Sequence, residues 1–197
     1  MIPANDTQSS ADPSRGRRAF IRWGAATLAL HTSLGRAFAE NLSQAADNLV
    51  AIENFSAAGT PLGAVRTPRI VKTDAEWQRQ LSTLAYEVTR RGGTEAPFSG
   101  AYASSHADGL YRCICCNTAL YDSRTKFESG TGWPSFWKPL SALNVVATED
   151  RSLFMTRTAI SCRLCDAHLG HVFDDGPKPT GLRYCMNSVA LTFAARA

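Results

Sequence analysis

The sequence lacks an excess of charge of one sign over most of its length. Its 197 residues include 21 Lys and Arg residues and 17 Asp and Glu residues, a formal net charge of +4. Residues 1–39 contain five of the Arg residues, no Lys and two Asp residues, which leaves 16 basic and 15 acidic residues in the rest of the chain. A net charge of +1 there offers no argument for nucleic-acid binding, so the basic character belongs to the first 39 residues.

A sustained helical period and internal repeats are also missing after Pro97. Short runs rich in β-branched and aromatic residues, separated by turn residues, predict strands instead. These runs are Gly109 to Arg112, Ala119 to Tyr121, Leu143 to Thr148, Leu153 to Ser161 and Leu182 to Phe193. We therefore expect one mainly β, antiparallel domain with a helix packed at its edge.

Residues 1–39 have the features of an export signal. The segment Gly16 to Arg22, which reads GRRAFIR, resembles the twin-arginine motif, and the apolar segment Trp23 to Leu34 follows it. This segment is too short to span a bilayer, and Ala37-Phe38-Ala39 is a small-x-small cleavage pattern. We predict a cleaved twin-arginine signal peptide; the alternatives are an uncleaved anchor and a basic amphipathic surface helix.

A linker and one helix are predicted between the signal and the strands. Residues 40–70 are weakly periodic and carry no chemistry, so we expect a flexible linker before a domain at residues 71–195. Thr73 and Glu76 form a capping-box pattern that begins a helix, and Gly92-Gly93 ends it. Its apolar face comprises Trp77, Leu81, Leu84, Ala85 and Val88.

The six cysteines include two C-x-x-C pairs. Cys113 and Cys116 form one, and Cys162 and Cys165 form the other. Together they supply four thiolates, the tetrahedral set that Zn²⁺ prefers, and leave no open coordination position for catalysis. The alternatives are two disulfides, which suit an exported protein, or one redox-active pair. Because the twin-arginine route carries folded proteins, the metal could be bound before export, and we predict one structural zinc ion.

Cys185 stands in a pattern typical of a reactive cysteine. Arg183, Cys185 and Asn187 occupy alternate positions of a predicted strand and hence one of its faces. A neighbouring guanidinium favours the nucleophilic thiolate, and an amide can orient a substrate. Other polar residues nearby in sequence are His168, His171, Asp174 and Asp175. We expect them in a Gly- and Pro-rich loop, where they could transfer protons; the alternative is a small buried Cys185 beside a surface arginine.

Several motifs agree in order and spacing over about Val71 to Phe193. They are the two C-x-x-C pairs, Glu128 to Phe136 (ESGTGWPSF), His168 to Phe173 (HLGHVF), Asp175 to Pro177 (DGP) and Arg183 to Asn187 (RYCMN). Together they resemble the B-type methionine sulfoxide reductases. The resemblance implies a mainly β, β-tent-like fold of two antiparallel sheets with short N-terminal helices and a structural zinc site. It also implies thiol-dependent reduction of the R epimer of methionine sulfoxide, mainly in proteins.

The resemblance assigns roles to individual residues. The Cys185 thiolate attacks the sulfoxide sulfur while an acid protonates its oxygen, so that methionine leaves and Cys185 becomes a sulfenic acid. His168 and His171 match the histidines that bind the oxygen and handle the proton, and Trp133 matches the aromatic wall that receives the substrate methyl group. The polar residues that surround these groups in the family correspond to Asp175, Arg183 and Asn187 of this sequence.

One position departs from the family pattern. Many members carry a second, resolving cysteine where this chain has Thr131. Cys115 is the remaining thiol, and its place inside a metal-binding turn favours a passive neighbour of the zinc over a resolving cysteine. We therefore predict that an external, thioredoxin-like dithiol reduces the Cys185 sulfenic acid directly.

Two other classes of protein share part of this pattern. A zinc-ribbon interaction module would explain the four paired cysteines but would leave Cys185 and the histidines without a role. An exported thiol–disulfide oxidoreductase would use one C-x-x-C pair. In the preferred interpretation the twin-arginine machinery exports an enzyme that repairs oxidised proteins of the cell envelope, in the periplasm where the cell has two membranes.

Overall fold

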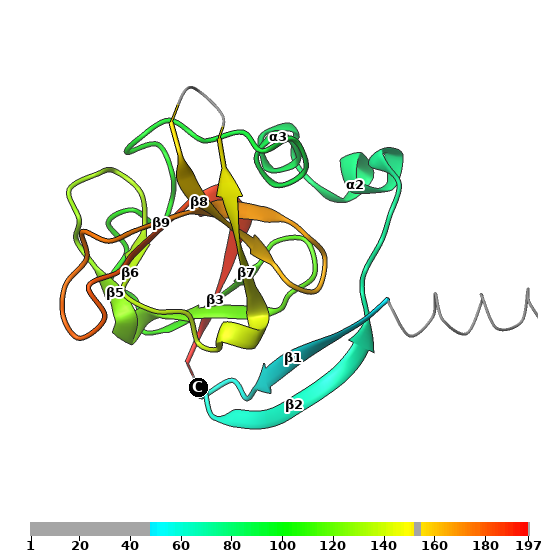
Figure 1. Cartoon of the computed structure of the whole chain (residues 1–197), viewed down its shortest axis with the longest axis horizontal. Coiled ribbons are helices and arrows are strands. Elements are labelled where there is room, and N and C mark those ends of the chain that lie inside the picture. Colours follow the sequence, from blue (N-terminus) through cyan, green and yellow to red (C-terminus); the bar gives the residue numbers. More distant parts are fainter. Residues whose placement is uncertain (1–47, 152–154, 197) are drawn as a thin grey trace, which may run out of the picture. The chain divides into compact units, whose positions relative to one another are not determined.

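The computed structural model describes residues 48–151 and 155–196, and the expected signal peptide, residues 1–39, lies outside them. The described residues form three antiparallel sheets of two, six and three strands, together with two short α-helices (Figure 1). The prediction of a mainly β fold with antiparallel sheets is thus confirmed, but the described residues form three sheets and not the two that the resemblance implies, because the first two of the described strands make a sheet of their own. No helix among the described residues is long and apolar enough to cross a membrane.

The two-stranded sheet is a hairpin of β1 (Leu49–Phe55) and β2 (Pro61–Pro68). It lies where the sequence predicts a flexible linker. Val50 and Ile52 alternate on the buried face of β1, and an irregularity in the pairing at Asn54 and Phe55 turns the Phe55 ring inward as well. The linker prediction does not hold for these strands, because the few buried apolar positions stand among Ala, Ser and Gly residues that obscure their alternation.

A buried amide ties this hairpin to the rest of the domain. Asn144, at the end of the short 3-10 helix η3 (Ala142–Asn144), is fully buried. Its Oδ1 accepts the backbone N–H of Glu53 at 2.8 Å, and its Nδ2 donates to the carbonyls of Glu53 at 2.9 Å and Ala119 at 2.8 Å. One side chain therefore satisfies backbone groups of two segments that are distant in sequence.

Two helices replace the single predicted helix. They are α2 (Asp74–Gln80) and α3 (Thr83–Arg91). The capping box at Thr73 is present, and Gly92 ends α3 in the left-handed conformation with φ 71°. The helix breaks at Leu81 because the Ser82 hydroxyl accepts the N–H of Ala85 at 3.2 Å and begins a new helix. This restart changes the helical phase, so that Leu84 is 50% exposed rather than buried.

The six-stranded sheet carries most of the candidate site. In spatial order its strands are β5 (Lys126–Phe127), β6 (Ser135–Phe136), β10 (Arg183–Met186), β9 (His168–Phe173), β8 (Arg157–Cys162) and β7 (Val145–Asp150). The three-stranded sheet has the order β11 (Leu191–Ala195), β3 (Gly109–Cys113) and β4 (Ala119–Asp122), and the 3-10 helix η2 (Ser123–Thr125) follows β4.

Aromatic side chains fill the core between the two larger sheets. Tyr121 of β4 stacks on Phe136 of β6 with ring centroids 4.5 Å apart, and Tyr111 of β3 meets the same ring edge-on at 5.0 Å. All three side chains are fully buried. The Tyr121 hydroxyl donates to the Met186 sulfur at 3.1 Å, which satisfies a polar group that burial would otherwise destabilise.

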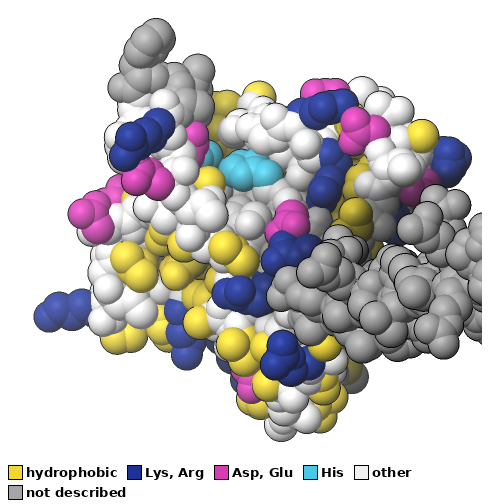
Figure 2. All heavy atoms as spheres, turned by 45° about the vertical axis from the view of Figure 1, so that its right-hand side comes forward, with side chains coloured by type: hydrophobic (Ala, Val, Ile, Leu, Met, Phe, Trp, Pro, Cys, Tyr) yellow, Lys and Arg dark blue, Asp and Glu magenta, His cyan; other side chains and the backbone are white. Residues whose placement is uncertain are grey.

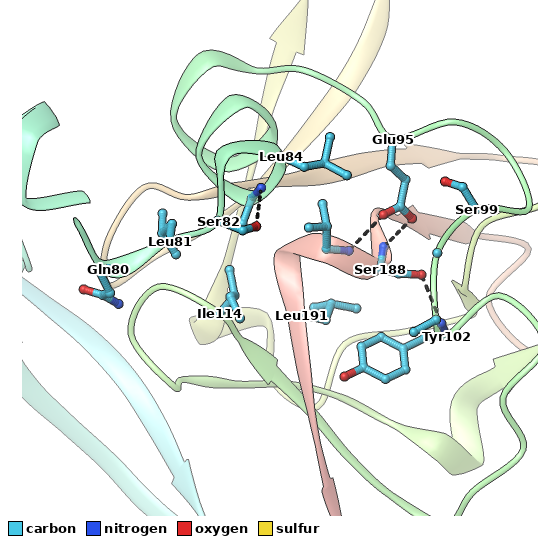
Figure 3. A pocket seen from close by; sticks show the side chains of 14 residues that line it. Gln80, Leu81, Ser82, Leu84, Glu95, Ser99, Tyr102, Ile114, Ser188 and Leu191 are labelled. Carbon is cyan, nitrogen blue, oxygen red and sulfur yellow. Dashed lines mark hydrogen bonds between the residues drawn. The ribbon is translucent and has the colours of Figure 1, made fainter. Parts of the chain in front are cut away.

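The strand predicted from Leu182 to Phe193 is interrupted. β10 and β11 belong to different sheets, and the 3-10 helix η5 (Ser188–Ala190) separates them. The buried carboxylate of Glu95 accepts the backbone N–H groups of Ser188 at 2.6 Å and Val189 at 2.9 Å, which stabilises the start of η5 (Figure 3). A cavity of about 410 Å³ lies between η5, α3 and the loop that contains Tyr102. The same close-up shows the side chains that line it.

Candidate active site

Cys185 lies in the middle of the six-stranded sheet. Its strand, β10, has β6 on one side and β9 on the other. Cys185 pairs with Ser135 across the first ladder and with His171 across the second. Paired residues point to the same face of a sheet, so the thiol and the imidazole share one face. The predicted association of Cys185 with His171 thus follows from strand register.

The two histidines lie on β9 and not in the predicted loop. Residues three apart on a regular strand point to opposite faces. In β9 the pairing with β8 is irregular. Ser161 pairs with His168, but the residue before it, Ile160, pairs with Gly170, so Leu169 is an extra residue on β9. This bulge at Leu169 changes the alternation, and the rings of His168 and His171 meet edge-on with centroids 5.3 Å apart.

Burial distinguishes His168 from His171. Nε2 of His168 is buried and has no hydrogen-bond partner within the described residues. Burial, followed by the proximity of His171, lowers the pKa of His168 to about 4. At neutral pH His168 is therefore uncharged. Nε2 of His171 lies 2.8 Å from Oδ2 of Asp150, a carboxylate from β7.

A small pocket of about 120 Å³ opens beside Cys185. Four of its lining residues are among the predicted site residues: Trp133, His171, Cys185 and Asn187. The others are Thr94, Arg157, Gly170 and Phe173. Usual small-molecule pockets measure roughly 300–1,000 Å³, so this one suits a group the size of a single side chain.

The wall and floor of the pocket are linked through Glu95. Its backbone carbonyl accepts the indole N–H of Trp133 at 3.2 Å, and its backbone N–H donates to Oδ1 of Asn187 at 3.0 Å. Nδ2 of Asn187 donates to the carbonyl of Leu169 at 3.1 Å. Asn187 follows the end of β10 and is buried, so its place in the pocket comes from these bonds and not from the predicted strand alternation.

Arg183 and Asp175 lie next to the pocket without lining it. Nε and Nη2 of Arg183 donate to the two oxygens of Asp175, each at 2.8 Å. This pairing lowers the pKa of Asp175 and raises that of Arg183, to which the neighbouring Cys185 also contributes. The guanidinium stacks over the ring of Phe173 at 4.4 Å. Arg183 therefore contacts a pocket wall and places positive charge near the thiol.

Thr131 is adjacent to the candidate nucleophile. Its Oγ1 lies 3.8 Å from Sγ of Cys185. The hydroxyl of Ser129 lies 2.8 Å from that of Thr131 and 2.8 Å from that of Ser135. The position at which the family resemblance leads us to expect a resolving cysteine thus holds a hydroxyl within contact distance of Cys185.

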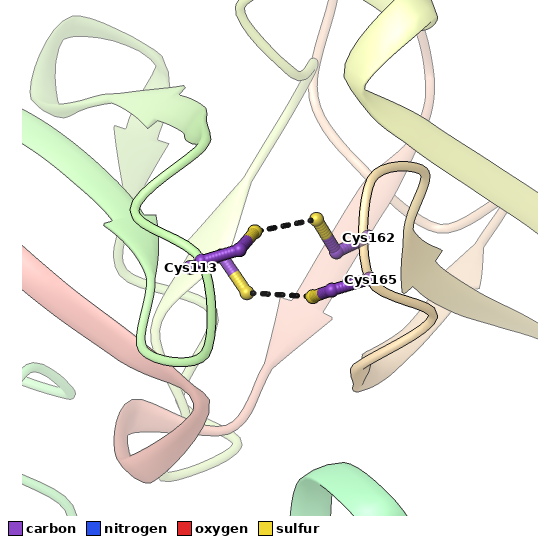
Figure 4. A group of neighbouring side chains, drawn as sticks. Cys113, Cys162 and Cys165 are labelled. Atoms are coloured by element: carbon purple, nitrogen blue, oxygen red, sulfur yellow. Dashed lines mark hydrogen bonds between the residues drawn. The ribbon is translucent and has the colours of Figure 1, made fainter. Parts of the chain in front are cut away.

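The four paired cysteines form one cluster (Figure 4). Their sulfur atoms all lie within 4.8 Å of one another, with 3.7 Å between Cys113 and Cys165 and 3.5 Å between Cys116 and Cys162. A tetrahedral zinc ion with Zn–S bonds of about 2.3 Å would hold its sulfurs about 3.8 Å apart. A disulfide needs about 2.05 Å, and all six cysteines are free. The cluster therefore fits a metal ion better than the disulfide alternative.

Two matching turns build this cluster. The N–H of Asn117 donates to the carbonyl of Cys113 at 2.8 Å, and that of Asp166 donates to Cys162 at 2.9 Å. Asn117 and Asp166 both adopt positive φ, at 62° and 56°. Asn and Asp tolerate this conformation better than other non-glycine residues. Cys115 is buried beside the first turn, with its sulfur 3.5 Å from the Thr89 hydroxyl.

Sequence reasoning missed the contribution of the β7–β8 hairpin. Asp150 and Arg157 pair across this hairpin at 2.8 Å, and Arg157 lines the pocket. The only signal in the sequence is a pair of opposite charges on either side of a turn. Such pairs are common on surfaces, so this one becomes informative only when the strand register is known.

The charges on the surface are mixed. On the face shown in Figure 2, Lys and Arg side chains are interspersed with Asp and Glu side chains. This agrees with the nearly balanced composition after residue 39.

Comparison with known proteins gives a consistent result. The family model described as the SelR domain matches residues 81–195. The peptide methionine sulfoxide reductase MsrB of Herminiimonas arsenicoxydans is 55% identical over 129 residues, which cover 66% of this chain and 94% of that protein. The MsrB proteins of Pseudomonas savastanoi and Pseudomonas entomophila are 55% and 53% identical over 128 residues, 65% of this chain and 98% of each relative. The chain therefore belongs to the peptide methionine sulfoxide reductase MsrB family, an oxidoreductase family, and contains its SelR domain.

Proposed function

We propose that this protein is a peptide-methionine (R)-S-oxide reductase that uses Cys185 to reduce the R epimer of methionine sulfoxide in oxidised proteins. The observation that carries the proposal is the pocket of about 120 Å³ that Cys185 lines together with His171 and Trp133. It combines a thiol, a group able to donate a proton and an aromatic wall in a space that suits one side chain.

The first half of the reaction is a two-electron exchange between sulfur atoms. The Cys185 thiolate attacks the sulfoxide sulfur while the His171 imidazolium protonates the sulfoxide oxygen. The S–O bond of the substrate breaks, methionine leaves, and the oxygen remains on Cys185 as a sulfenic acid. The sulfoxide gains the two electrons that Cys185 loses. An external dithiol then reduces the sulfenic acid, releases water and becomes a disulfide.

The other site residues position these groups in our proposal. Trp133 receives the substrate methyl group, and its π-face suits the positive charge that develops on sulfur. Asn187 orients the bound sulfoxide at the pocket floor. Arg183, held by Asp175, places a positive charge next to Cys185. His168 is a neutral ring packed against His171.

We further propose that one Zn²⁺ ion binds to Cys113, Cys116, Cys162 and Cys165. The spacing and burial of the four sulfurs support this assignment. Four thiolates complete the tetrahedral shell of zinc, so the ion would have a structural role and would join the β3–β4 turn to the β8–β9 turn.

The cellular setting is part of the proposal. The twin-arginine-like motif supports export by the twin-arginine machinery to the periplasm, where the enzyme would repair exported proteins after oxidative stress. A hydroxyl at Thr131 in place of a resolving thiol supports direct reduction of Cys185 by a thioredoxin-like dithiol.

Turnover of separated epimers tests the reaction. A peptide with either the R or the S epimer of methionine sulfoxide is incubated with the protein and a small dithiol, and the methionine product is measured. We expect consumption of R alone, abolished by Cys185→Ser and retained by the matched control Cys115→Ser. If neither epimer is consumed by metal-loaded protein, the catalytic assignment is wrong. Loss of dithiol-dependent turnover in Cys115→Ser would instead make Cys115 a resolving residue.

Cell fractionation tests the export step. A tagged full-length chain is compared with a variant in which Arg17 and Arg18 are both replaced by Lys. We expect the unaltered chain in the periplasmic fraction and the variant in the cytoplasm. Equal distribution of the two would exclude the twin-arginine route.

A further inference from the structure

The β7–β8 hairpin brings an ion pair to the candidate proton donor. Asp150 at the end of β7 and Arg157 at the start of β8 are partners in the ladder. Oδ2 of Asp150 accepts a hydrogen bond from Nη2 of Arg157 at 2.8 Å, and it lies 2.8 Å from Nε2 of His171. One carboxylate oxygen therefore connects the hairpin to the imidazole that pairs with Cys185.

Strand register places these groups on one face. Asp150 lies two residues beyond Thr148, which pairs with Ala159, and Ala159 in turn pairs with His171. Side chains two apart on a strand share a face, so the row that contains His171 has the carboxylate beside it. The contact results from three paired strands, each with its own register.

Burial makes this contact effective. The side chains of His171, Asp150 and Arg157 are 11%, 20% and 23% exposed. Charges shielded to this extent interact more strongly than charges in open water. The guanidinium of Arg157 favours the ionised form of Asp150, and an ionised carboxylate can only accept hydrogen bonds. Nε2 of His171 must then carry the proton of the shared bond, which leaves Nδ1 to serve a ligand in the pocket.

We propose that Asp150 is a positioning residue for His171, and that Arg157 holds Asp150 in place. Asp150 orients the imidazole through Nε2 and selects the tautomer, so that the ring can donate a proton to the sulfoxide oxygen from Nδ1. This inference rests on the proposed function. In the step it supports, the Cys185 thiolate, the sulfoxide and the imidazolium become a sulfenic acid, methionine and a neutral imidazole, so atoms and charge balance.

Charged and titratable groups surround His171. They are Asp150 from β7, Arg157 from β8, His168 from the same strand and Cys185 from β10. Besides the Cys185 thiolate, Asp150 is the anion of this set. Its replacement by an amide removes the anionic acceptor that fixes the proton on Nε2 of His171, so the ring should lose its preferred tautomer and orientation.

The test compares Asp150→Asn with Glu149→Gln in the full-length chain. Glu149 is the adjacent, exposed residue of β7, so the control removes the same charge from the same strand. Rates of R-sulfoxide reduction are measured from pH 5 to 9 with saturating dithiol. For Asp150→Asn we expect kcat to fall on the order of tenfold to hundredfold with KM nearly unchanged, because the variant still binds the substrate but no longer positions the proton donor. Asp150→Glu should recover part of the rate, and Glu149→Gln should match the unaltered protein.

An unchanged kcat in folded Asp150→Asn would overturn the proposal, as would a rise in KM that accounts for the whole loss of kcat/KM, because a residue that positions the proton donor acts on kcat. An equal fall of kcat in Glu149→Gln would overturn it too. Should Asp150→Asn fail to fold, ¹⁵N spectra of the histidine rings in the unaltered protein decide: we expect the Nε2–H tautomer for His171, and the Nδ1–H tautomer would refute the assignment. This measurement needs no turnover, so it separates failure of the inference from failure of the proposed reaction.

Discussion

Replacement of Gly170 by alanine should separate the two strands that carry the reacting groups. Gly170 pairs with Met186 across the β9–β10 ladder, next to the His171–Cys185 pair. A Cβ atom on Gly170 would lie 2.1 Å from the carbonyl oxygen of Cys185 and 2.9 Å from Cα of Met186. Carbon and oxygen atoms in ordinary contact need more than about 3 Å, so the strands must move apart by about 1 Å.

A shift of this size has two expected consequences. Forcing an extra methyl group into a packed ladder typically lowers the free energy of unfolding by about 1–3 kcal/mol. A displacement of about 1 Å between a nucleophile and its proton donor can lower the rate about 100-fold. We therefore expect Gly170→Ala to be less stable in urea unfolding and to have kcat/KM for the R-sulfoxide peptide about 100-fold lower in the folded protein.

Gly63→Ala is the matched control. Gly170 has a positive φ of 154°, and Gly63 of β2 has a positive φ of 97°, but a Cβ atom on Gly63 would meet nothing within 4 Å. It should lose about 1 kcal/mol from backbone strain and keep kcat/KM unchanged. If folded Gly170→Ala keeps the unaltered kcat/KM, the strands tolerate the added methyl group, and the argument that this glycine sets the distance between Cys185 and His171 is wrong.

Three further predictions follow from the cluster, from Thr131 and from His168. Metal analysis should find one zinc ion per chain, and removal of the ion by thiol modification and chelation should unfold the domain. The reason is that thiolate–zinc binding contributes about 10–16 kcal/mol, which is comparable with the whole stability of a domain. Unchanged thermal unfolding of the metal-free protein would contradict this prediction. Thr131→Cys places a thiol where Oγ1 now lies 3.8 Å from Sγ of Cys185, so one equivalent of sulfoxide should produce an internal disulfide that mass spectrometry detects. The unaltered chain should instead keep a sulfenic acid that dimedone traps. Equal trapping by dimedone in both chains would contradict this prediction. The pKa of His168 is about 4 in the folded state and about 6.5 in the unfolded state, so the unfolded chain binds more protons between these values. Stability should therefore fall by about 3 kcal/mol as pH drops from 6.5 to 4. His168→Gln should lack this component in urea unfolding, and identical pH slopes would refute it.

Local sequence signals predicted the parts of the fold that depend on neighbouring residues. The capping box at Thr73, the left-handed end at Gly92 and strands β3 and β4 lie where the sequence places them. The four-cysteine cluster was also predictable, because each C-x-x-C turn is a local structure. The prediction of a single helix was wrong because Ser82 is a good N-cap and begins a second helix. In the sequence, the continuous apolar face outweighed this signal.

The remaining features depend on pairing between distant segments. His168 and His171 lie side by side only because a bulge at Leu169 changes the alternation along β9. The adjacent Gly170 marks an irregular position in the strand, but it does not say which pairing register results. Asp150 reaches His171 across two intervening ladders, so its part in the site requires the registers of three strands. Registers of this kind are set by the packing of the whole sheet, which local propensity does not encode.

The four-cysteine cluster and the active site are coupled through the backbone. Cys162 ends β8, and Cys165 is followed after two residues by β9, which carries His171. Cys113 pairs with Leu191 of β11, the continuation of the chain beyond Cys185. The cluster therefore lies close in sequence to the start of β9, which carries His171, and on the strand that pairs with β11. Because four thiolates would complete the coordination shell of a zinc ion, its influence on the reaction would act through the register of β9 and β10, and weakening the cluster should lower activity before it unfolds the domain.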